Sequence, residues 1–408
     1  MLKHVPASAA PSPWLKFWSL EPTVTFLNHG SFGAVPLPIL AVQQKLREQL
    51  ERQPLRFFLR EFEPLLEAAR SELAVFVGAD SEELVFVPNA TTGVNAVLRS
   101  LFFQPGDEIL TTNLEYNACR NALDFVASRA GATVVVAQVP FPIQSPDTVV
   151  EAVLARVSPR TRLALLDHIT SSTALILPIQ QLVSQLKQQG VETLVDGAHA
   201  PGMVPINLHE IGATYYTGNC HKWLCAPKGA AFLYVQPHQQ SQIRPLTISH
   251  GANSSRTDKS RFQLEFDWMG TDDPTAYLCI PEAIRFLGSL LPGGWLELMQ
   301  NNRVQALAAR QLLCQALGVS PPCPDEMIGA MAVVPLPDTL SRYEQEPHHN
   351  WPLLQEILFK QFDIEVPVID GIIPFQQMIR ISVQIYNSLD QYEYLAQVLV
   401  QLQKHNSE

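Results

Sequence analysis

The chain has 408 residues, a formal net charge of -11 and a charged fraction of only 16%. It therefore lacks the basic excess that binds nucleic acids or anionic membrane surfaces, and we expect neither partner. Hydrophobic residues make up 47% of the sequence, which is enough for a large buried core, and the length predicts about two or three folding units.

The six cysteines are scattered along the chain and form no C-x-x-C pair. This spacing predicts neither a zinc site nor a disulfide framework, so no metal is expected. The N-terminal stretch "MLKHVPASAAPSPWLKFWSL" is interrupted by Pro and Lys, so we do not expect a signal peptide. No run approaches the roughly 18 apolar residues of a membrane span. We expect a reduced, cytoplasmic protein.

Between about residues 84 and 236, short β-rich runs alternate with longer helical patterns. We expect strands over 83–89, 106–116, 132–139, 161–169, 191–199, 213–219 and 229–235, and helices over 91–103, 120–131, 147–157 and 179–190. Nearly continuous Val, Ile and Leu runs separated by helices are typical of parallel strands that are covered on both faces. The sequence therefore predicts an α/β fold, with a mostly parallel sheet sandwiched by helices and a ligand site outside the carboxyl ends of the strands.

Beyond about residue 285 the pattern changes, after a Pro- and Gly-containing break at "LLPGGW". A helical pattern over 303–317 is followed by strand-like runs over 330–336 and 378–385. We expect a large α/β domain over 20–285 and a smaller α+β domain over 286–408, with residues 1–19 packing on the smaller one.

The first polar cluster is "PNATTGV", between a predicted strand and a predicted helix. The start of a helix offers unpaired N–H groups and the positive end of its dipole, which suits a phosphate, and Thr91 and Thr92 add hydroxyl donors. An ordinary N-cap explains the same residues equally simply, because Thr caps are common.

The second cluster is "LVDGAHAPG", in which Asp196 directly follows an apolar strand. An acid at this position can hold a metal, cap a helix or bind a protonated ring nitrogen, and a structural Asp in a turn is the plain alternative. His199, three residues later, faces the same ligand or is simply packed.

The third cluster is "GNCHKWLCAPKG", which contains two lysines. A reactive lysine amine needs a lowered pKa, which comes from burial or from a neighbouring positive charge. Lys222 lies between His221 and Trp223, where burial is expected, whereas Lys228 lies in a Pro-Lys-Gly turn. Lys222 is therefore the better candidate.

Together, a helix start suited to phosphate, a strand-end acid and a buried lysine are the three attachment points of pyridoxal 5'-phosphate. The lysine forms the Schiff base, the aspartate keeps the pyridine nitrogen protonated, and the helix start takes the phosphate.

The segments "VDGAHA" and "HKWLCAPKG" resemble the class V aminotransferase family of fold type I pyridoxal-phosphate enzymes, and "FLNHGSFGAVP" and "NATTGVNAVL" resemble its isopenicillin N epimerase-like branch. The similarity extends roughly from Leu27 to Asn387. It implies that Lys222 carries the cofactor and moves the α-proton, that Asp196 pairs with the ring nitrogen, and that His199 contacts the 3'-oxygen. It further implies cofactor contacts by Thr91, Thr92, Tyr116, Ser171, Asn219 and His221.

The resemblance also implies the substrate and the assembly. Arg380 in "MIRISVQIYN" matches the arginine that binds the α-carboxylate of an amino-acid-type substrate, and Asn28 and His29 are expected at the entrance. Gly270 and Thr271 of "WMGTDD" resemble the segment that reaches the phosphate of the neighbouring subunit, which implies a homodimer with shared active sites.

The resemblance implies an isopenicillin N epimerase-like reaction at the α-carbon, with a slight preference over the two alternatives, transamination and C–S or other β-elimination. Desulfurases of this class carry a reactive cysteine shortly before the arginine strand, and "FDIEVPVIDGIIPFQQMIR" has none, which disfavours that mechanism. A non-catalytic binding protein on the same fold, or a nucleotide-binding α/β enzyme, are the alternatives of another class.

Overall fold

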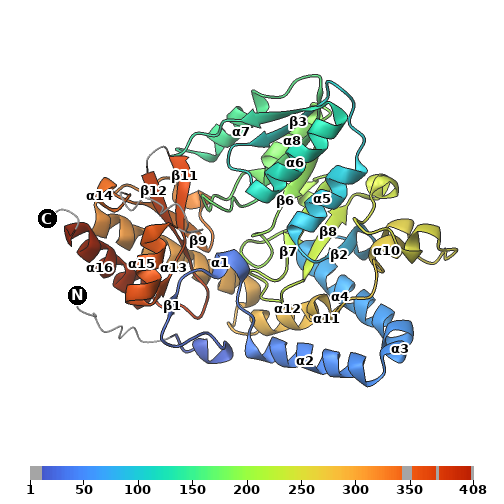
Figure 1. Ribbon diagram of the computed structural model, residues 1–408, viewed down its shortest axis with the longest axis horizontal. Helices are drawn as coiled ribbons and strands as arrows, with labels where there is room; N and C mark the ends of the chain where they lie inside the picture. Colours follow the sequence, from blue (N-terminus) through green and yellow to red (C-terminus); the bar gives the residue numbers. More distant parts are fainter. Residues whose placement is uncertain (1–11, 342–351, 374–375, 406–408) are drawn as a thin grey trace.

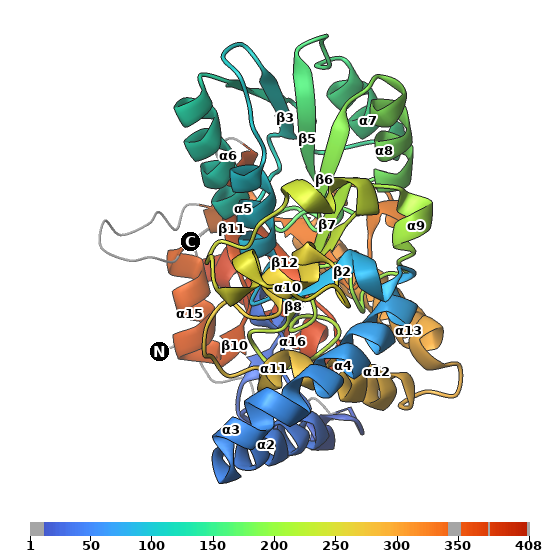
Figure 2. The same ribbon diagram turned by 90° about the vertical axis from the view of Figure 1, so that its right-hand side faces the viewer.

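The computed structural model describes residues 12–341, 352–373 and 376–405. Its centre is a seven-stranded sheet in the order β2-β8-β7-β6-β5-β3-β4 (Figures 1 and 2). The strands are β2 (Leu84–Val87), β3 (Glu108–Thr112), β4 (Thr133–Ala137), β5 (Thr161–Asp167), β6 (Glu192–Asp196), β7 (Tyr215–Asn219) and β8 (Ala231–Val235). Each falls inside a strand expected from the sequence.

Only β8 runs against its neighbours in this sheet, since it pairs antiparallel with both β2 and β7. The remaining neighbours pair in parallel. No crossover helix joins β7 to β8, only the loop 220–230, and such a connection can join antiparallel strands but not parallel ones. The predicted mostly parallel sheet is confirmed, and the loop that carries Lys222 is this reversal.

Helices cover both faces of the sheet. Figure 2 shows α5 (Ala90–Ser100) and α6 (Asn117–Ala130) on one side, and α7 (Pro146–Leu154) and α8 (Ile179–Gln188) on the other. Alternate strand residues enter two separate apolar clusters: Leu163 and Leu165 of β5 join one, and Ala164 and Leu166 the other. The expected helix over 91–103 starts at Ala90 and stops at Ser100, because Leu101 is extended (ψ 146) and the Ser100 hydroxyl accepts the Arg244 N–H at 2.9 Å.

A second layer of helices lies below the sheet in Figure 1 and wraps the β2–β8 edge. It comprises α2 (Leu37–Arg52), α3 (Pro54–Arg56), α4 (Phe62–Val77), α11 (Thr275–Leu278) and α12 (Ile280–Gly288). Helix α10 (Arg261–Phe266) lies beside β2, at the right of Figure 1. Three short α-helical turns are α1 (His29–Phe32), α9 (Leu208–Ile211) and α14 (Asp338–Ser341). The 3-10 turns are Leu15–Phe17, Ser81–Glu83, Pro237–Gln242, His250–Asn253 and Asp325–Met327, and Phe57–Glu61 is a π turn. Within the described residues, no helix has the length and apolarity needed to cross a membrane.

The C-terminal part forms a three-stranded antiparallel sheet in the order β11-β12-β9. Its elements are α13 (Gly294–Leu317), β9 (Met331–Pro335), α15 (Leu353–Phe362), β10 (Ile364–Glu365), β11 (Val368–Ile373), β12 (Gln376–Ser382) and α16 (Leu389–His405). Two segments near the N-terminus contact this part: β1 (Thr25–Phe26) pairs with β10, and the Ser12 hydroxyl donates to the carbonyl of Ile385 at 2.8 Å. The expected division at residue 285 stays a prediction, and residues 1–11 lie outside the described part.

Candidate active site

A cavity of about 200 Å³ lies at the carboxyl ends of the central strands, where a ligand site was expected. It brings together residues that lie more than 100 positions apart in the sequence. The predicted site residues that line it are Thr91, Tyr116, Ser171, Asp196, His199, Asn219, His221 and Lys222, and they are joined by Ser31, Phe32, Asn89, Ala90, Asp167, Ile169 and Ala198.

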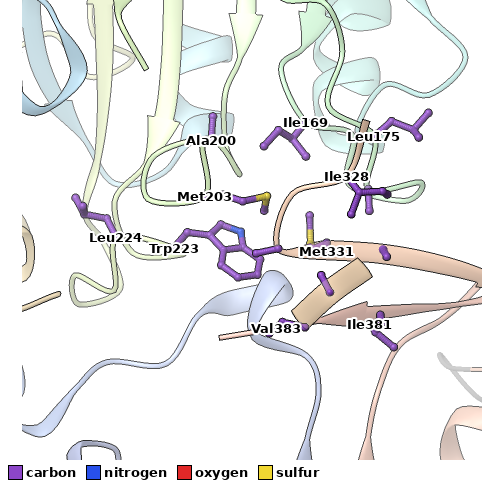
Figure 3. Packing of buried hydrophobic residues seen from close by; sticks show 14 of the residues in the cluster. Ile169, Leu175, Ala200, Met203, Trp223, Leu224, Ile328, Met331, Ile381 and Val383 are labelled. Carbon is purple, nitrogen blue, oxygen red and sulfur yellow. The ribbon is translucent and has the colours of Figure 1, made fainter. Parts of the chain in front are cut away.

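The loop that carries Lys222 is held from both sides by glycines with positive φ. A Cβ on Gly33 (φ 70°) would lie 2.4 Å from the His221 carbonyl oxygen, and one on Gly202 (φ 88°) would lie 2.6 Å from the Trp223 backbone. Trp223 itself is buried in the same apolar cluster as Met203 and Met331, and Figure 3 shows its indole beside Met203. The lysine backbone is therefore fixed where the loops of the large sheet meet the C-terminal part.

The Lys222 amine lies at 3.1 Å from Nε2 of His199. Burial, and then the positive charge of Arg380, lowers the pKa of Lys222 to about 8. The Trp223 indole N–H donates to Nδ1 of His199 at 3.4 Å, so the neutral imidazole carries its proton on Nε2, facing the amine. Burial holds the pKa of His199 well below its usual value, so this imidazole does not compete with the amine for a proton.

Asp196 ends β6 and is 3% exposed. Its Oδ1 accepts the Ala198 N–H at 2.9 Å, and its Oδ2 accepts the Cys119 thiol at 3.1 Å. Burial raises the pKa of this carboxyl. A thiol is a weak donor, so Asp196 can accept a stronger one from a ligand in the cavity.

The start of α5 borders the cavity, and its cap is Asn89. The Asn89 side chain accepts both the N–H (2.9 Å) and the hydroxyl (3.0 Å) of Thr92, so the cap occupies that hydroxyl and Thr92 does not line the cavity. Thr91 does line it, and Asn219 of β7 accepts the Ala90 N–H at 2.8 Å. The helix start therefore presents Thr91 and the positive end of the α5 dipole to a ligand.

His221 lies beside this helix start at the cavity. Its Nδ1 donates to the carbonyl of Ala230 at 2.9 Å, which leaves Nε2 for a ligand. Burial lowers the pKa of this histidine to about 4, so the unliganded imidazole is neutral.

Arg380 of β12 lies directly behind the cavity wall and is only 4% exposed. Its guanidinium donates to the Ser171 carbonyl at 2.6 Å and to the Ser31 hydroxyl at 2.8 Å. Nε has no partner, and no carboxylate of the described residues lies within ion-pair distance. A buried cation without a charged partner, between two residues that line the cavity, is suited to bind an anion.

Asn28 stands next to this arginine, because its Oδ1 accepts the Ser31 hydroxyl at 2.6 Å and lies 3.4 Å from Nη2 of Arg380. His29 is not at an entrance: it is fully buried, and Nε2 donates to the backbone carbonyl of Lys222 at 3.1 Å. The expectation that His29 lines the entrance is therefore wrong, since α1 turns its ring under the lysine loop.

Gly270 and Thr271 are exposed and do not line this cavity. They lie beside a separate cavity of about 280 Å³ that is lined by Met269, Asp272 and Lys228 among others. Within the chain they therefore contact no part of the site, and only a neighbouring subunit could use them there.

A family profile described as "Aminotransferase class-V" matches residues 51–291. The chain belongs to the class V aminotransferase family. It is 36% identical over 404 residues to an isopenicillin N epimerase of Amycolatopsis lactamdurans, covering 95% of this chain and 97% of that protein. It is 31% identical over 396 residues to a probable chloroplastic L-cysteine desulfhydrase of Arabidopsis thaliana, covering 92% and 82% of the two chains.

Among solved structures, a mutant of C-DES with glycine covalently linked to the PLP cofactor superposes with a TM-score of 0.80 at 21% identity, covering 95% of this chain and 99% of the other. The same cystine C–S lyase in complex with cysteine persulfide gives a TM-score of 0.75 at 20% identity, covering 93% and 98% of the two chains. At this identity, the likeness confirms the expected pyridoxal-phosphate enzyme fold.

Enzymes of this family depend on pyridoxal phosphate, and so does this chain. The cavity fits that cofactor. It holds the Lys222 amine, whose pKa is lowered, and a helix start with the Thr91 hydroxyl as a donor. It also holds the buried Asp196 carboxyl, whose Oδ2 accepts only from the weak thiol donor of Cys119. The family acts on small amino-acid-type substrates, as expected from the sequence.

Ser31, Phe32 and Asp167 line the cavity but were not expected from the sequence. Asp167 follows an apolar strand in "LLDHIT", the same signal that singled out Asp196, so it could have been found. Ser31 carries no such signal, because only the packing of α1 against β12 brings it to Arg380.

Proposed function

We propose that this chain removes the α-proton of an amino-acid substrate with the Lys222 amine, while Arg380 binds the α-carboxylate. The observation that carries the proposal is the buried guanidinium of Arg380, which has only neutral partners and lies behind Ser31 and Ser171 at the same cavity as Lys222. A carboxylate in the cavity supplies the missing negative charge and accepts a two-pronged hydrogen bond.

Each residue expected to hold the cofactor is assigned to one part of it by the chemistry of its side chain. Lys222 attaches the cofactor covalently, Asp196 accepts the ring N–H, and His199 donates to the 3'-oxygen. Thr91, Asn219, His221 and the α5 start hold the phosphate, with Thr92 acting through the cap. Tyr116 and Ser171 contact the ring and its oxygen. When bound, the cofactor withdraws electrons from the α-carbon and makes its proton acidic.

Among the reactions at the α-carbon, β-elimination with loss of a sulfur substituent needs one base and one leaving group. The titratable residues that line the cavity are Tyr116, Asp167, Asp196, His199, His221 and Lys222. We assign Asp196 and His221 to the cofactor, and His199 pairs with Lys222. Lys222 is then the one amine positioned to carry the proton. We therefore favour C–S β-elimination.

Epimerisation is the second candidate, because the cavity holds a further acid in the Tyr116 hydroxyl and the 36% identical relative is an isopenicillin N epimerase. An epimerase must return a proton to the face opposite the one from which it left. Tyr116 is 44% exposed and not locked in the core, so it can serve that face.

We also propose a homodimer in a reducing, cytoplasmic compartment. Gly270 and Thr271 are exposed and contact no part of the site within their own chain, which fits a role in a neighbouring subunit. All six cysteines are buried as free thiols, which fits a reducing compartment. Light scattering tests the dimer, and a monomer that retains full activity contradicts shared sites.

The deciding experiment incubates the cofactor-loaded protein with L-cysteine, L-cystine and a panel of other L-amino acids in D2O. Release of pyruvate and sulfide supports elimination, whereas α-deuterium in both enantiomers without release supports epimerisation. Tyr116→Phe is the matched variant: it abolishes inversion if Tyr116 is the second acid and leaves elimination intact. The absence of both product release and α-deuterium with every amino acid contradicts the proposal.

A further inference from the structure

Two carboxyl groups lie beside Asp196 that none of these roles uses. Asp167 ends β5 and is the strand partner of Asp196 on β6. Glu115 follows β3, and polar atoms of Glu115, Cys119 and Asp196 all lie within 4.8 Å of one another. Three acids from three neighbouring parallel segments thus meet at the ring-nitrogen end of the cavity.

Both additional acids carry a buried oxygen without a partner. Asp167 is 2% exposed and lines the cavity, and its Oδ2 has no hydrogen-bond partner among the described residues. Glu115 Oε1 is in the same state, while its Oε2 accepts the Thr111 hydroxyl at 3.1 Å. An ionised carboxylate with an unpaired buried oxygen is costly, whereas a protonated carboxyl is much less so.

The groups that face this cluster do not supply enough positive charge for three carboxylates. The Lys222 amine favours ionisation of Asp167 and Asp196, and Arg120 favours that of Glu115. Cys119 and Tyr216, which face Asp196, stay neutral because burial raises the pKa of both groups. Burial and mutual repulsion raise the pKa of Glu115 and of Asp167 well above their usual range, as expected for acids that share one site.

We propose that Glu115 and Asp167 are positioning residues that stay protonated beside Asp196, so that the cluster carries a single negative charge, on Asp196, when the ring nitrogen is bound. The two neutral acids leave Asp196 as the sole charged partner of the ring N–H, and their protons remove the repulsion that a carboxylate at either position would exert on it. The proposal rests on the proposed placement of the cofactor, but the protons belong to the chain and are measurable without it.

The test uses Asp167→Asn and Glu115→Gln, which replace each acid by a neutral group of the same shape. In wild type, the folded chain keeps a proton that unfolded Asp167 loses above its usual pKa of 3.8, so stability falls as pH rises from there toward the raised folded pKa. One such proton changes the folding equilibrium up to tenfold per pH unit. Asp167→Asn and Glu115→Gln should therefore unfold at higher urea than wild type at pH 8, with a gain that shrinks toward pH 5.

Glu108→Gln, at the opposite end of β3, is the matched control. Hydrogen bonds from Ser158 and Arg160 lower the pKa of Glu108, so this variant should lose stability at pH 8 and lose less at low pH. The proposal is overturned if neither Asp167→Asn nor Glu115→Gln gains stability with rising pH relative to wild type. If one variant does not fold, the other decides.

A second readout uses the cofactor-loaded chain. The infrared band of protonated carboxyl groups at pH 7 should lose intensity in the double variant Glu115→Gln/Asp167→Asn, and an unchanged band overturns the proposal. If wild type takes up no pyridoxal phosphate, the proposed function fails, while the urea comparison still decides the state of the cluster.

Discussion

Nε2 of His29 donates to the backbone carbonyl of Lys222 at 3.1 Å, across 193 positions of sequence. Burial lowers the pKa of His29 to about 3, so its ring is neutral with the proton on Nε2. Nδ1 consequently accepts the Tyr386 hydroxyl at 2.8 Å. A chain of two hydrogen bonds thus ties the lysine backbone to α1 and to the C-terminal part.

This chain of bonds predicts the effect of Tyr386→Phe. The variant leaves a buried Nδ1 unpaired, and we expect the free energy of unfolding in urea to fall by about 1–3 kcal/mol. The matched control is Tyr392→Phe, since Tyr392 is also buried but donates to the Ser382 carbonyl at 2.7 Å and not to His29. Both should lose stability, but only Tyr386→Phe should slow cofactor attachment; equal rates contradict the link to Lys222.

Of the two lysines of the loop, only Lys222 should be needed to hold the cofactor covalently. Wild type and Lys228→Ala should retain pyridoxal phosphate after borohydride reduction, mapped to Lys222 by peptide mass spectrometry. Lys222→Ala should retain none and lose at least about 10²–10⁴-fold in α-proton exchange. Lys228 is a sound control because it is exposed and its amine donates to the Gly33 carbonyl at 2.7 Å. Reduction-stable cofactor in Lys222→Ala contradicts the assignment.

The pH dependence of cofactor attachment follows from the Lys222 amine, which attacks only when unprotonated. Because the pKa of Lys222 is about 8, the rate of attachment to the cofactor-free chain should rise about tenfold per pH unit below 8 and level off above it. The charge of Arg380 contributes to this lowering, so Arg380→Ala should shift the curve to higher pH. Stopped-flow absorbance measures both curves, and coincident curves contradict the coupling.

Arg380→Lys should raise KM for amino acids about 10- to 100-fold, because a charge-assisted hydrogen bond contributes about 1.5–3 kcal/mol and lysine cannot bind the carboxylate with two parallel bonds. For substrates without an α-carboxylate, Arg380→Lys and wild type should have similar KM values. Arg310→Lys is the control: Arg310 of α13 is also 4% exposed, but it pairs with Asp325 and does not line the cavity. A KM unchanged in Arg380→Lys contradicts the carboxylate site.

Much of the candidate site followed from local pattern. Asp196 and Lys222 were identified because strand ends and the loops after them meet at one edge of a parallel sheet, whatever the details of packing. The role of Thr92 was less well predicted. The sequence places two threonines at the helix start, but whether a hydroxyl points into the cavity depends on the cap, and Asn89 binds that of Thr92.

His29 and Ser31 show the limit of such reasoning. Both lie in one short turn, α1, and nothing in "NHGSF" says which side chain turns toward the lysine loop and which toward β12. That choice is made by partners more than 190 positions away, Lys222 and Arg380.

The sequence by itself determined the layered α/β fold and predicted the site edge of the sheet, the lysine and the aspartate, because hydrophobic periodicity and strand-end chemistry are local. The arginine was predicted from the family resemblance alone. Only the tertiary structure decided that Asp167 and Glu115 join Asp196 in one buried cluster. The pKa values of these acids depend on burial and on charges from other strands, and neither quantity exists until the chain is folded.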